Sequence, residues 1–375
     1  MDKPDDDRIK VSTLELFFDL VFVFTVTQLT NAVVHHLTWQ GVGQIALMLA
    51  IMWWMYSGFV WLTNEVAPSS SIRRTLLFVG MAGFLCLALS IPGAFHDTGW
   101  AFGIGYFFVN AVHTCLFLVS GGMSAVRAMK RFAPLNMLTA TLVLIGGFIH
   151  GWPQYALWAT AVLLQLLYPF LVGHAGFNIR ARHFAERHGL VIIVALGETV
   201  IALGVGLAGL KLTPGLIAAV VLGLVLAYVL YWAYFGFDDE RAEHALARFQ
   251  GVVRARKALV AYGYAHYPML LGIVLAAAGI KLSIGYETEP LEWPAAWALA
   301  GGVGLFFLGH AYFRYVMDLP RPWMRLVQGA AAVSTAVLGV ALVAWVQLVV
   351  LIVVVYALVI VDDLMSLGRW DITKR

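Results

Sequence analysis

The chain has 375 residues, of which 61% are hydrophobic and only 12% are charged, and its mean hydropathy is +0.84. Water-soluble domains are roughly 45–50% apolar and about 25% charged, so this composition excludes an ordinary soluble protein and indicates an all-α polytopic membrane protein. The net charge is +3, but the basic residues lie in scattered short loops and form no patch with aromatic residues. We therefore expect no nucleic-acid partner.

Twelve apolar runs follow one another along the chain, and each has about the 20 residues that cross a lipid bilayer. They cover residues 14–34, 42–62, 75–94, 101–120, 134–150, 153–173, 188–208, 214–236, 258–280, 293–316, 325–343 and 345–363. The fifth run is short. The last two come from one long run, which we divide near Ala344–Trp345. We therefore expect about 12 transmembrane helices. Seven tryptophans near the ends of the runs are expected at the membrane interface: Trp39, Trp61, Trp100, Trp152, Trp293, Trp323 and Trp345.

The distribution of Lys and Arg predicts the orientation of these spans. With twelve spans both termini lie on one side, and that side receives 22 of the 24 Lys and Arg residues; only Lys211 and Lys281 fall opposite. Positively charged residues accumulate in cytoplasmic loops, so we expect cytoplasmic ends at 1–13 and 364–375 in a bacterial inner membrane. The acidic N-terminus does not resemble a signal peptide, and we expect the first helix to remain in the mature protein.

An internal repeat relates the two halves of the chain. Residues 54–59 and residues 232–237 share the pattern Trp-x-Tyr-x-Gly-Phe, where x is any residue. The Arg-Arg start of 73–82 matches the Arg-Lys start of 256–265. We therefore expect two six-helix halves, 14–173 and 188–363, joined by a cytoplasmic loop at 174–187. Repeats of six spans have the same orientation, which predicts a pseudo-two-fold axis along the membrane normal and a cavity between the halves.

The seventh run carries a carboxylate, Glu198, about halfway across the bilayer. Small residues share its helical face: Ala195, Ala202, Gly206 and Gly209. Small residues allow helices to pack closely, so the carboxylate is expected to face the protein interior rather than lipid. An ionisable residue in this place indicates a binding or transport function. The alternative is a protonated carboxyl that only holds a neighbouring helix.

The first run contains Glu15 and Asp19, four residues apart and therefore on one helical face. Glu15 suits the helix N-terminus, where the helix dipole favours a negative charge. Asp19 lies about two turns inside, which predicts burial against another helix with a paired cation or a proton.

Two further runs contain histidines. In the ninth, His266 precedes Pro268, and this proline removes a backbone donor and frees the carbonyl of Tyr264. A broken helix of this kind is typical of transport sites, although a simple packing kink is the alternative. In the fourth run, His113 is a candidate binding residue or a hydrogen-bonded core residue. His310 and Arg314, in the tenth run, are weaker candidates, and Arg314 is expected to extend to the interface.

The loop between the halves contains His174, His183 and Glu186, and His188 follows directly after it. This spacing differs from the His-Glu-x-x-His pattern of zinc proteases. We predict no cofactor, and a divalent metal remains possible only as an alternative.

Three stretches resemble the bacterial low temperature requirement A (LtrA) family: residues 14–24 (Leu-Glu-Leu-Phe-Phe-Asp-Leu-Val-Phe-Val-Phe), 186–198 (Glu-Arg-His-Gly-Leu-Val-Ile-Ile-Val-Ala-Leu-Gly-Glu) and 264–274 (Tyr-Ala-His-Tyr-Pro-Met-Leu-Leu-Gly-Ile-Val). The resemblance extends over essentially the whole chain and implies the same multi-span layout. The motif positions that it marks are Glu15, Asp19, Glu186, Glu198 and His266. The family is named for a growth phenotype in the cold, which implies no reaction or substrate.

Three functions fit these features. The first is a secondary transporter for a small solute, coupled to a proton or cation, in which Glu198 exchanges the ion while Asp19 and His266 help to bind. The second is a membrane-embedded enzyme acting on a lipid or isoprenoid, with the same residues as acid/base groups or metal ligands. The third is a non-catalytic scaffold in cold adaptation, whose polar residues only hold helices together.

Overall fold

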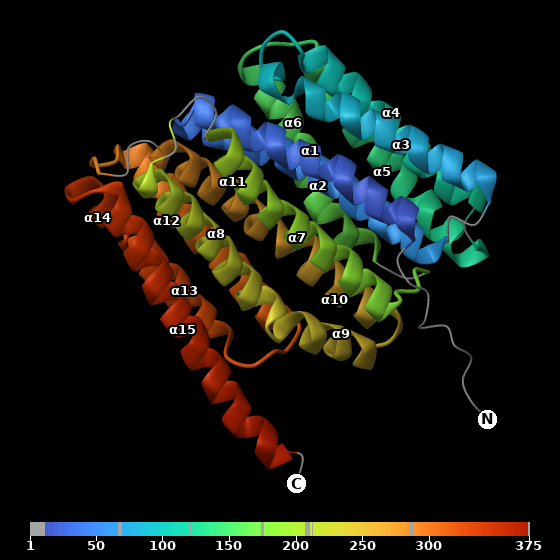
Figure 1. The fold of residues 1–375 in the computed structure, drawn as a ribbon. Coiled ribbons are helices and arrows are strands. Elements are labelled where there is room, and N and C mark those ends of the chain that lie inside the picture. Colours follow the sequence, from blue (N-terminus) through green and yellow to red (C-terminus); the bar gives the residue numbers. More distant parts are fainter. Residues whose placement is uncertain are drawn as a thin grey trace. The chain divides into compact units, whose positions relative to one another are not determined.

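The structure is a computed structural model that describes residues 12–66, 70–120, 122–173, 176–206, 211, 213–284 and 288–373. Helices are the only regular secondary structure in these ranges (Figure 1). In chain order they are α1 (Thr13–His35), α2 (Trp39–Glu65), α3 (Ser71–Ser90), the 3₁₀-helix η1 (Ile91–Gly93), α4 (Gly99–Ser120), α5 (Met123–Gly147), α6 (Trp152–Val172), α7 (Ala181–Gly206), α8 (Pro214–Phe235), α9 (Asp238–Arg248), α10 (Gly251–Ala258), the π-helix η2 (Leu259–Tyr264), α11 (His266–Ser283), α12 (Trp293–Val316), α13 (Pro322–Ser334), α14 (Ala336–Ala341) and α15 (Ala344–Thr373).

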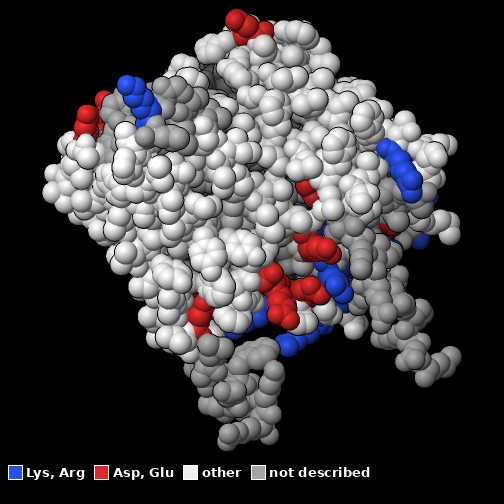
Figure 2. All heavy atoms as spheres, viewed as in Figure 1, with Lys and Arg blue, Asp and Glu red and all other residues white. Residues whose placement is uncertain are grey.

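Within these ranges, eleven helical stretches are long and apolar enough to cross a membrane. The other long helix, α5, has 25 residues, but its first half carries Arg127, Lys130 and Arg131. Its apolar part is therefore short, as the fifth run predicted. Most of the face drawn in Figure 2 carries no acidic or basic side chain, as is expected of a surface in an apolar environment. The chain is thus an all-α polytopic membrane protein.

Five of the seven tryptophans near span ends are exposed, and Trp345 is half-buried. Trp39 and Trp152 are 89% and 79% exposed, and Trp100, Trp293 and Trp323 are also exposed. Trp61, in contrast, is buried, and its ring packs edge-on against Phe177 and Phe184. Other aromatic rings of the protein cover Trp61, and its place at the membrane interface stays a prediction.

Contacts between residues divide the chain into two compact units. Unit 1 comprises Met1–Ala32, Trp39–Val194 and Glu243–Tyr264, and unit 2 comprises Val33–Thr38, Ala195–Ala242 and Ala265–Arg375. The halves expected from the repeat, 14–173 and 188–363, were defined by sequence matches rather than by contacts, and they stay a prediction.

In unit 1 the helices pack in a regular order. Helix α3 packs on α4, α4 on α5 and α5 on α6, while α2 contacts both α4 and α6. Glycines bring α4 and α5 into close contact: a Cβ atom on Gly103 would lie 2.9 Å from the Cα atom of Leu144. Close backbone approach at small residues is typical of helices that associate inside membranes.

Unit 2 has a similar order of neighbours. Helix α11 packs on α12, α12 on α13, and both α13 and α14 on α15, which also contacts α8. Helices α11 and α12 meet at Gly272 and Gly302, where a Cβ on Gly272 would lie 2.5 Å from the carbonyl oxygen of Gly302. Substitution of Gly272 by a larger residue must therefore push the two backbones apart.

Helix breaks divide two of the predicted runs. The ninth run contains the π-helix η2, and α11 begins at His266. Pro268 lacks the N–H that would bond the carbonyl of Tyr264, the last residue of η2, which accounts for a break at this point. The eleventh run is divided into α13 and α14 at Thr335, whose hydroxyl donates to the carbonyl of Ala332 over 2.7 Å. The uncertain boundary before the last span lies where we placed it, since α15 begins at Ala344.

Candidate functional site

The most concentrated group of buried ionisable side chains in unit 1 lies where the first turns of α1 and α7 meet. Glu15 and Asp19 lie one turn apart on α1, and His183 and Arg187 lie one turn apart on α7. All four side chains are almost completely buried. Together with Ser12 and Tyr56, which bond to the two acids, they form what we call the α1–α7 cluster.

Glu15 connects the start of α1 to His183. One carboxylate oxygen, Oε1, lies 3.0 Å from Nε2 of His183. The other, Oε2, accepts hydrogen bonds from the backbone N–H and the hydroxyl of Ser12, over 2.8 and 2.7 Å. Ser12-x-x-Glu15 is a capping box, in which the two side chains satisfy backbone donors at the first helical turn. The expected stabilisation of Glu15 at the helix N-terminus is therefore accompanied by a bond to a second helix.

Asp19 connects α1 to both α2 and α7. Its Oδ1 atom accepts a hydrogen bond from the hydroxyl of Tyr56 over 2.6 Å and lies 2.8 Å from Nη2 of Arg187. The expected burial of Asp19 with a cation is seen, and Arg187 is the cation. Among the described residues, the remaining oxygen Oδ2 of Asp19 and the Nε and Nη1 atoms of Arg187 have no hydrogen-bond partner. These atoms are available to water or to a bound group.

The two pairs also define the relative direction of the helix segments that carry them. Glu15 precedes Asp19 on α1, and their partners His183 and Arg187 follow in the same order on α7. With a spacing of four residues on each helix, the two segments run parallel. The cluster has two acids, one permanent cation and one histidine, so protonation of His183 would bring its formal charge to zero.

Aromatic rings surround the cluster within unit 1. Tyr56 stacks on Trp53 and lies close to Phe22, with ring centroids 5.4 and 4.3 Å apart. The indole N–H of Trp53 donates to the carbonyl oxygen of Gly263. These rings exclude water from one side of the ion pair, and a low local polarity strengthens the attraction between Asp19 and Arg187.

Glu186, the third acid of the family motifs in this region, points away from the cluster. Its side chain is exposed, whereas His183 and His188 on the same helix are buried. His188 Nδ1 bonds the carbonyl of Phe184 over 2.9 Å, as is common within a helix. Among the described residues no three His, Cys, Asp or Glu side chains gather in a way that could hold a metal ion. His174 lies outside the described residues.

His113 lies elsewhere in unit 1, on α4. Its Nε2 atom is 3.0 Å from the carbonyl oxygen of Gly58 on α2, and its ring packs between those of Phe59 and Phe117. The structure therefore does not bring His113 together with Glu15 or Asp19 in one hydrogen-bonded group.

Glu198 and His266 belong to unit 2. Glu198 is 1% exposed, and Ala195 and Ala202 on its face of α7 are buried as well. The carboxylate thus faces protein, as the small-residue pattern predicted; Gly209, at the end of that pattern, is outside the described residues. His266 is fully buried, and its Nε2 atom lies 2.9 Å from the hydroxyl of Tyr234.

A second buried charge cluster, in unit 2, was not predicted from the sequence. Asp238 lies 2.8 Å from Nε2 of His310 and within ion-pair distance of Arg314 and Arg325. Asp362 on α15 pairs with Arg314 over 2.6 Å and with Arg321 over 2.9 Å. Arg314 is 1% exposed, so the expectation that it extends to the interface was wrong: two buried aspartates hold it inside.

The sequence contained only a weak signal for these partners. Arg187 was counted among the cytoplasmic loop cations, because the apolar run begins at residue 188. Asp238 and Asp362 each begin an Asp-Asp pair at the end of an apolar run, a place where acidic residues are usually solvated.

Comparison with known proteins agrees with this arrangement of motifs. Residues 10–360 match the profile of the family described as bacterial low temperature requirement A protein (LtrA). The chain is also 26% identical over 345 residues to the uncharacterized protein RA0937 of Rhizobium meliloti (strain 1021), an alignment that covers 86% of this chain and 81% of that protein. Since the match includes the acids of α1, the basic residues of α7 and nearly every helix, the chain belongs to the LtrA family.

Proposed function

We propose that the protein is a proton-coupled secondary transporter for a small solute. The observation that carries this proposal is the α1–α7 cluster, in which two acids, a histidine and an arginine are buried within membrane-spanning helices. Burying ionisable groups in a membrane is costly, and those that persist there mark ion pathways and proton relays. A scaffold could hold the same helices together with apolar contacts at lower cost.

Asp19 is the proposed coupling residue. A proton on its carboxylate removes the negative charge that holds Arg187, which then needs another partner. An anionic or hydrogen-bond-accepting group of the solute could take that place, since two donor atoms of Arg187 have no partner among the described residues. Proton and solute binding would thereby become linked through one arginine. His183, bonded to Glu15, is the proposed second proton acceptor.

Glu198 and His266 are proposed to act in unit 2 at the same stage of transport. Glu198 is buried on the helix that also carries Arg187. His266, at the break before α11, would bind the solute together with the hydroxyl of Tyr234, with which it is paired. Glu186 is exposed and is proposed only as an entry-side residue.

Several features of packing support two parallel six-helix halves. The order α3–α4–α5–α6–α2 in unit 1 parallels the order α11–α12–α13/α14–α15–α8 in unit 2. Tyr56 and Tyr234 hold the same place in the matching Trp-x-Tyr-x-Gly-Phe segments, and each bonds a buried ionisable residue. The parallel course of α1 and α7 is that expected of first helices in repeats with the same orientation.

The proposal places the protein in the bacterial inner membrane with both termini in the cytoplasm. Its support is the distribution of Lys and Arg among the loops. In that orientation the α1–α7 cluster would lie in the cytoplasmic third of the bilayer, where protons are released to or taken from the cell interior.

The test uses the full chain in proteoliposomes on a solid-supported membrane. Common amino acids, sugars, nucleosides, short carboxylates and polyamines are added singly while currents are recorded with and without a pH gradient. We expect at least one solute to give a current that follows the pH gradient, and expect Asp19→Asn and Glu198→Gln to abolish it. The matched controls are Asp97→Asn and Glu240→Gln, whose side chains are exposed. No gradient-dependent current for any solute, or equal currents in Asp19→Asn, would contradict the proposal.

A further inference from the structure

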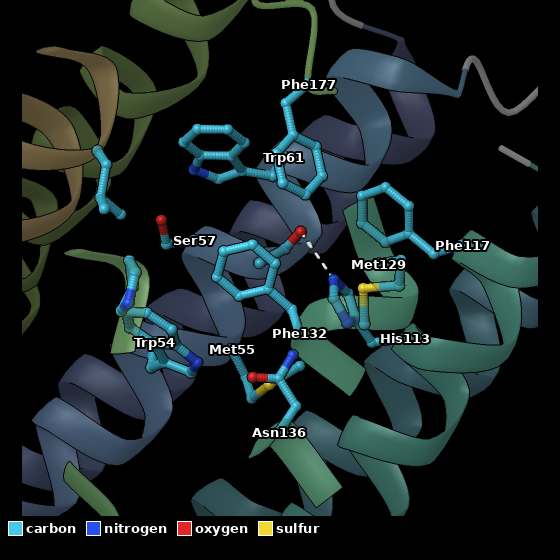
Figure 3. Close-up of a pocket in the computed structure, with 13 residues that line it drawn as sticks. Trp54, Met55, Ser57, Trp61, His113, Phe117, Met129, Phe132, Asn136 and Phe177 are labelled. Carbon is cyan, nitrogen blue, oxygen red and sulfur yellow. Dashed lines mark hydrogen bonds between the residues drawn. The ribbon is translucent and has the colours of Figure 1, made fainter. Parts of the chain in front are cut away.

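Two hollows in unit 1 differ in what they can hold. The one beside His113, among α2, α4, α5 and α6, has a volume of about 80 Å³ (Figure 3). This suits a few water molecules, each of which occupies about 30 Å³. The other, which we call the α1–α3 hollow, has a volume of about 360 Å³ and lies where α1 and α3 begin. Its size falls within the range of about 300–1,000 Å³ that is typical of small-molecule sites.

The α1–α3 hollow lies between neighbouring helices of unit 1. The rings of Phe18 on α1 and Phe84 on α3 are 5.2 Å apart, centroid to centroid. The described lining of the hollow consists of one cation, two hydroxyl groups and two apolar side chains: Arg74, Ser12, Thr13, Leu14 and Phe17. Arg74 and Thr13 are exposed, and none of the described lining residues is Asp or Glu. The hollow is therefore positively charged and suits an anion.

Beyond this polar end, both helices present apolar side chains to their surroundings. On α1, Phe17 is 47% exposed, and Leu20 on the same helical face is also exposed. On α3, Phe78 lies one turn after Arg74 and is 56% exposed. Phe17 and Arg74 line one hollow, so the faces that carry these residues open to the same side. Exposed apolar faces of this kind are suited to contact with a membrane.

We infer that the α1–α3 hollow binds the phosphate group of an anionic phospholipid, with its acyl chains along Phe17 and Phe78. A guanidinium such as that of Arg74 can donate two parallel hydrogen bonds to a phosphate, and the Thr13 hydroxyl can donate a third. Basic pockets between spanning helices bind lipid head groups in this way. A head group with a positive charge of its own would meet no acid among the described lining residues.

The apolar faces decide between a lipid and a free phosphate. Free phosphate would meet the cation but leave Phe17 and Phe78 without a contact, whereas a phospholipid uses both parts of the surface. The inference requires that the chain spans a membrane, and it does not depend on the proposed transport function.

The test titrates the full chain in detergent with dioleoylphosphatidylglycerol or with dioleoylphosphatidylcholine, and native mass spectrometry counts the bound lipids. The measured quantity is the dissociation constant of the first bound lipid. In the wild type we expect the anionic lipid to bind about fivefold more tightly, which is the contribution of one Arg near an anionic lipid. Arg74→Gln should remove this difference. The matched control is Arg127→Gln on α5, whose side chain is exposed and lies outside the described lining of the hollow.

A second pair of variants tests the apolar face. Phe17→Ala should weaken binding of the anionic lipid about threefold, because part of an aromatic side chain no longer shields the acyl chains. Phe108→Ala, on α4, is the control, since its side chain is 44% exposed and does not belong to the described lining. It should leave the binding unchanged.

Equal affinity for the two lipids in the wild type, or equal losses in Arg74→Gln and Arg127→Gln, would overturn the inference. Complete displacement of the lipid by millimolar inorganic phosphate would also overturn it, in favour of a site for free phosphate. So would a lipid preference that appears only when the three aspartates at 5–7 are replaced by Asn, because acidic residues of the chain itself would then be the occupant. None of these results involves Asp19 or a pH gradient, so failure here leaves the transport proposal standing.

Discussion

Nη2 of Arg187 lies 2.8 Å from Oδ1 of Asp19, and less than 3% of the surface of either side chain is exposed. The two residues are separated by 168 positions in the sequence, yet each is the principal counter-charge of the other. A single buried charge without its partner is far less stable than the pair. The positions of α1 and α7 in unit 1 are therefore energetically dependent on each other.

Removal of both members of this pair should destabilise the protein by less than the two single removals added together. Asp19→Asn or Arg187→Met alone leaves a buried polar or charged group without its partner, at a cost of about 3–5 kcal/mol. The double variant Asp19→Asn/Arg187→Met should lose less than the sum of the two. The measurement is the melting temperature in detergent.

Arg182→Ala is the control for the pair, because its side chain is exposed on the same helix. It should melt within a degree or so of the wild type, since exposed substitutions typically change stability by about 0.5 kcal/mol or less. Strictly additive losses in the double variant would show that Asp19 and Arg187 do not depend on each other.

The matching tyrosines provide a second comparison. Tyr56→Phe removes a hydrogen bond to a carboxylate, and Tyr234→Phe removes one to the imidazole ring of His266. Bonds to charged groups contribute about 1.5–3 kcal/mol, against about 0.5–1.5 kcal/mol for neutral ones. Tyr56→Phe should therefore lower the melting temperature more. The opposite order would indicate that the Asp19 contact is weak.

The capping box predicts a specific effect at the start of α1. Ser12→Ala removes the hydroxyl that bonds Glu15 and should cost about 0.5–2 kcal/mol, the range for N-cap residues. Thr13→Ala, one residue further on and exposed, should change little. Hydrogen exchange of the first turn of α1 provides the measurement. Similar exchange in both variants would exclude capping by Ser12.

Close helix packing in unit 2 makes a fourth stability prediction. A Cβ on Gly272 would meet the Gly302 carbonyl and the Phe306 backbone N at 2.5 and 2.6 Å, so Gly272→Ala should cost at least about 1–3 kcal/mol. Gly301→Ala, whose Cβ meets only the Trp297 ring at 3.7 Å, should be neutral or slightly stabilising. Thermal melting distinguishes the two, and a tolerated Gly272→Ala would show that the backbones can separate.

The sequence predicted elements well where apolar length alone determines them. The tenth run, 293–316, coincides with α12, and the division before the last span was placed at the first residue of α15. The predicted helix boundaries were less accurate where a helix continues past its apolar part. Helix α7 begins at Ala181, seven residues before its predicted start at 188, because its first turns carry charged residues.

Prediction of the site was limited for the same reason. Asp19 was expected to have a buried cation, but its partner could not be identified, since Arg187 resembles a loop residue when only hydropathy is considered. The cluster around Asp238 depends on side chains from several helices distant in sequence, which no local pattern brings together. Whether Glu15, Asp19, His113, Glu186, Glu198 and His266 bind a substrate stays a prediction.

The most direct test of proton coupling compares two transport modes in Asp19→Asn proteoliposomes, using the solute that gives the largest current in wild type. Exchange of labelled for unlabelled solute at equal pH needs no net proton movement, whereas accumulation against a gradient does. We predict that Asp19→Asn retains exchange but loses accumulation driven by a pH gradient, while Asp97→Asn retains both. Full pH-driven accumulation in Asp19→Asn would contradict the proposed role of this carboxylate and of its pair with Arg187.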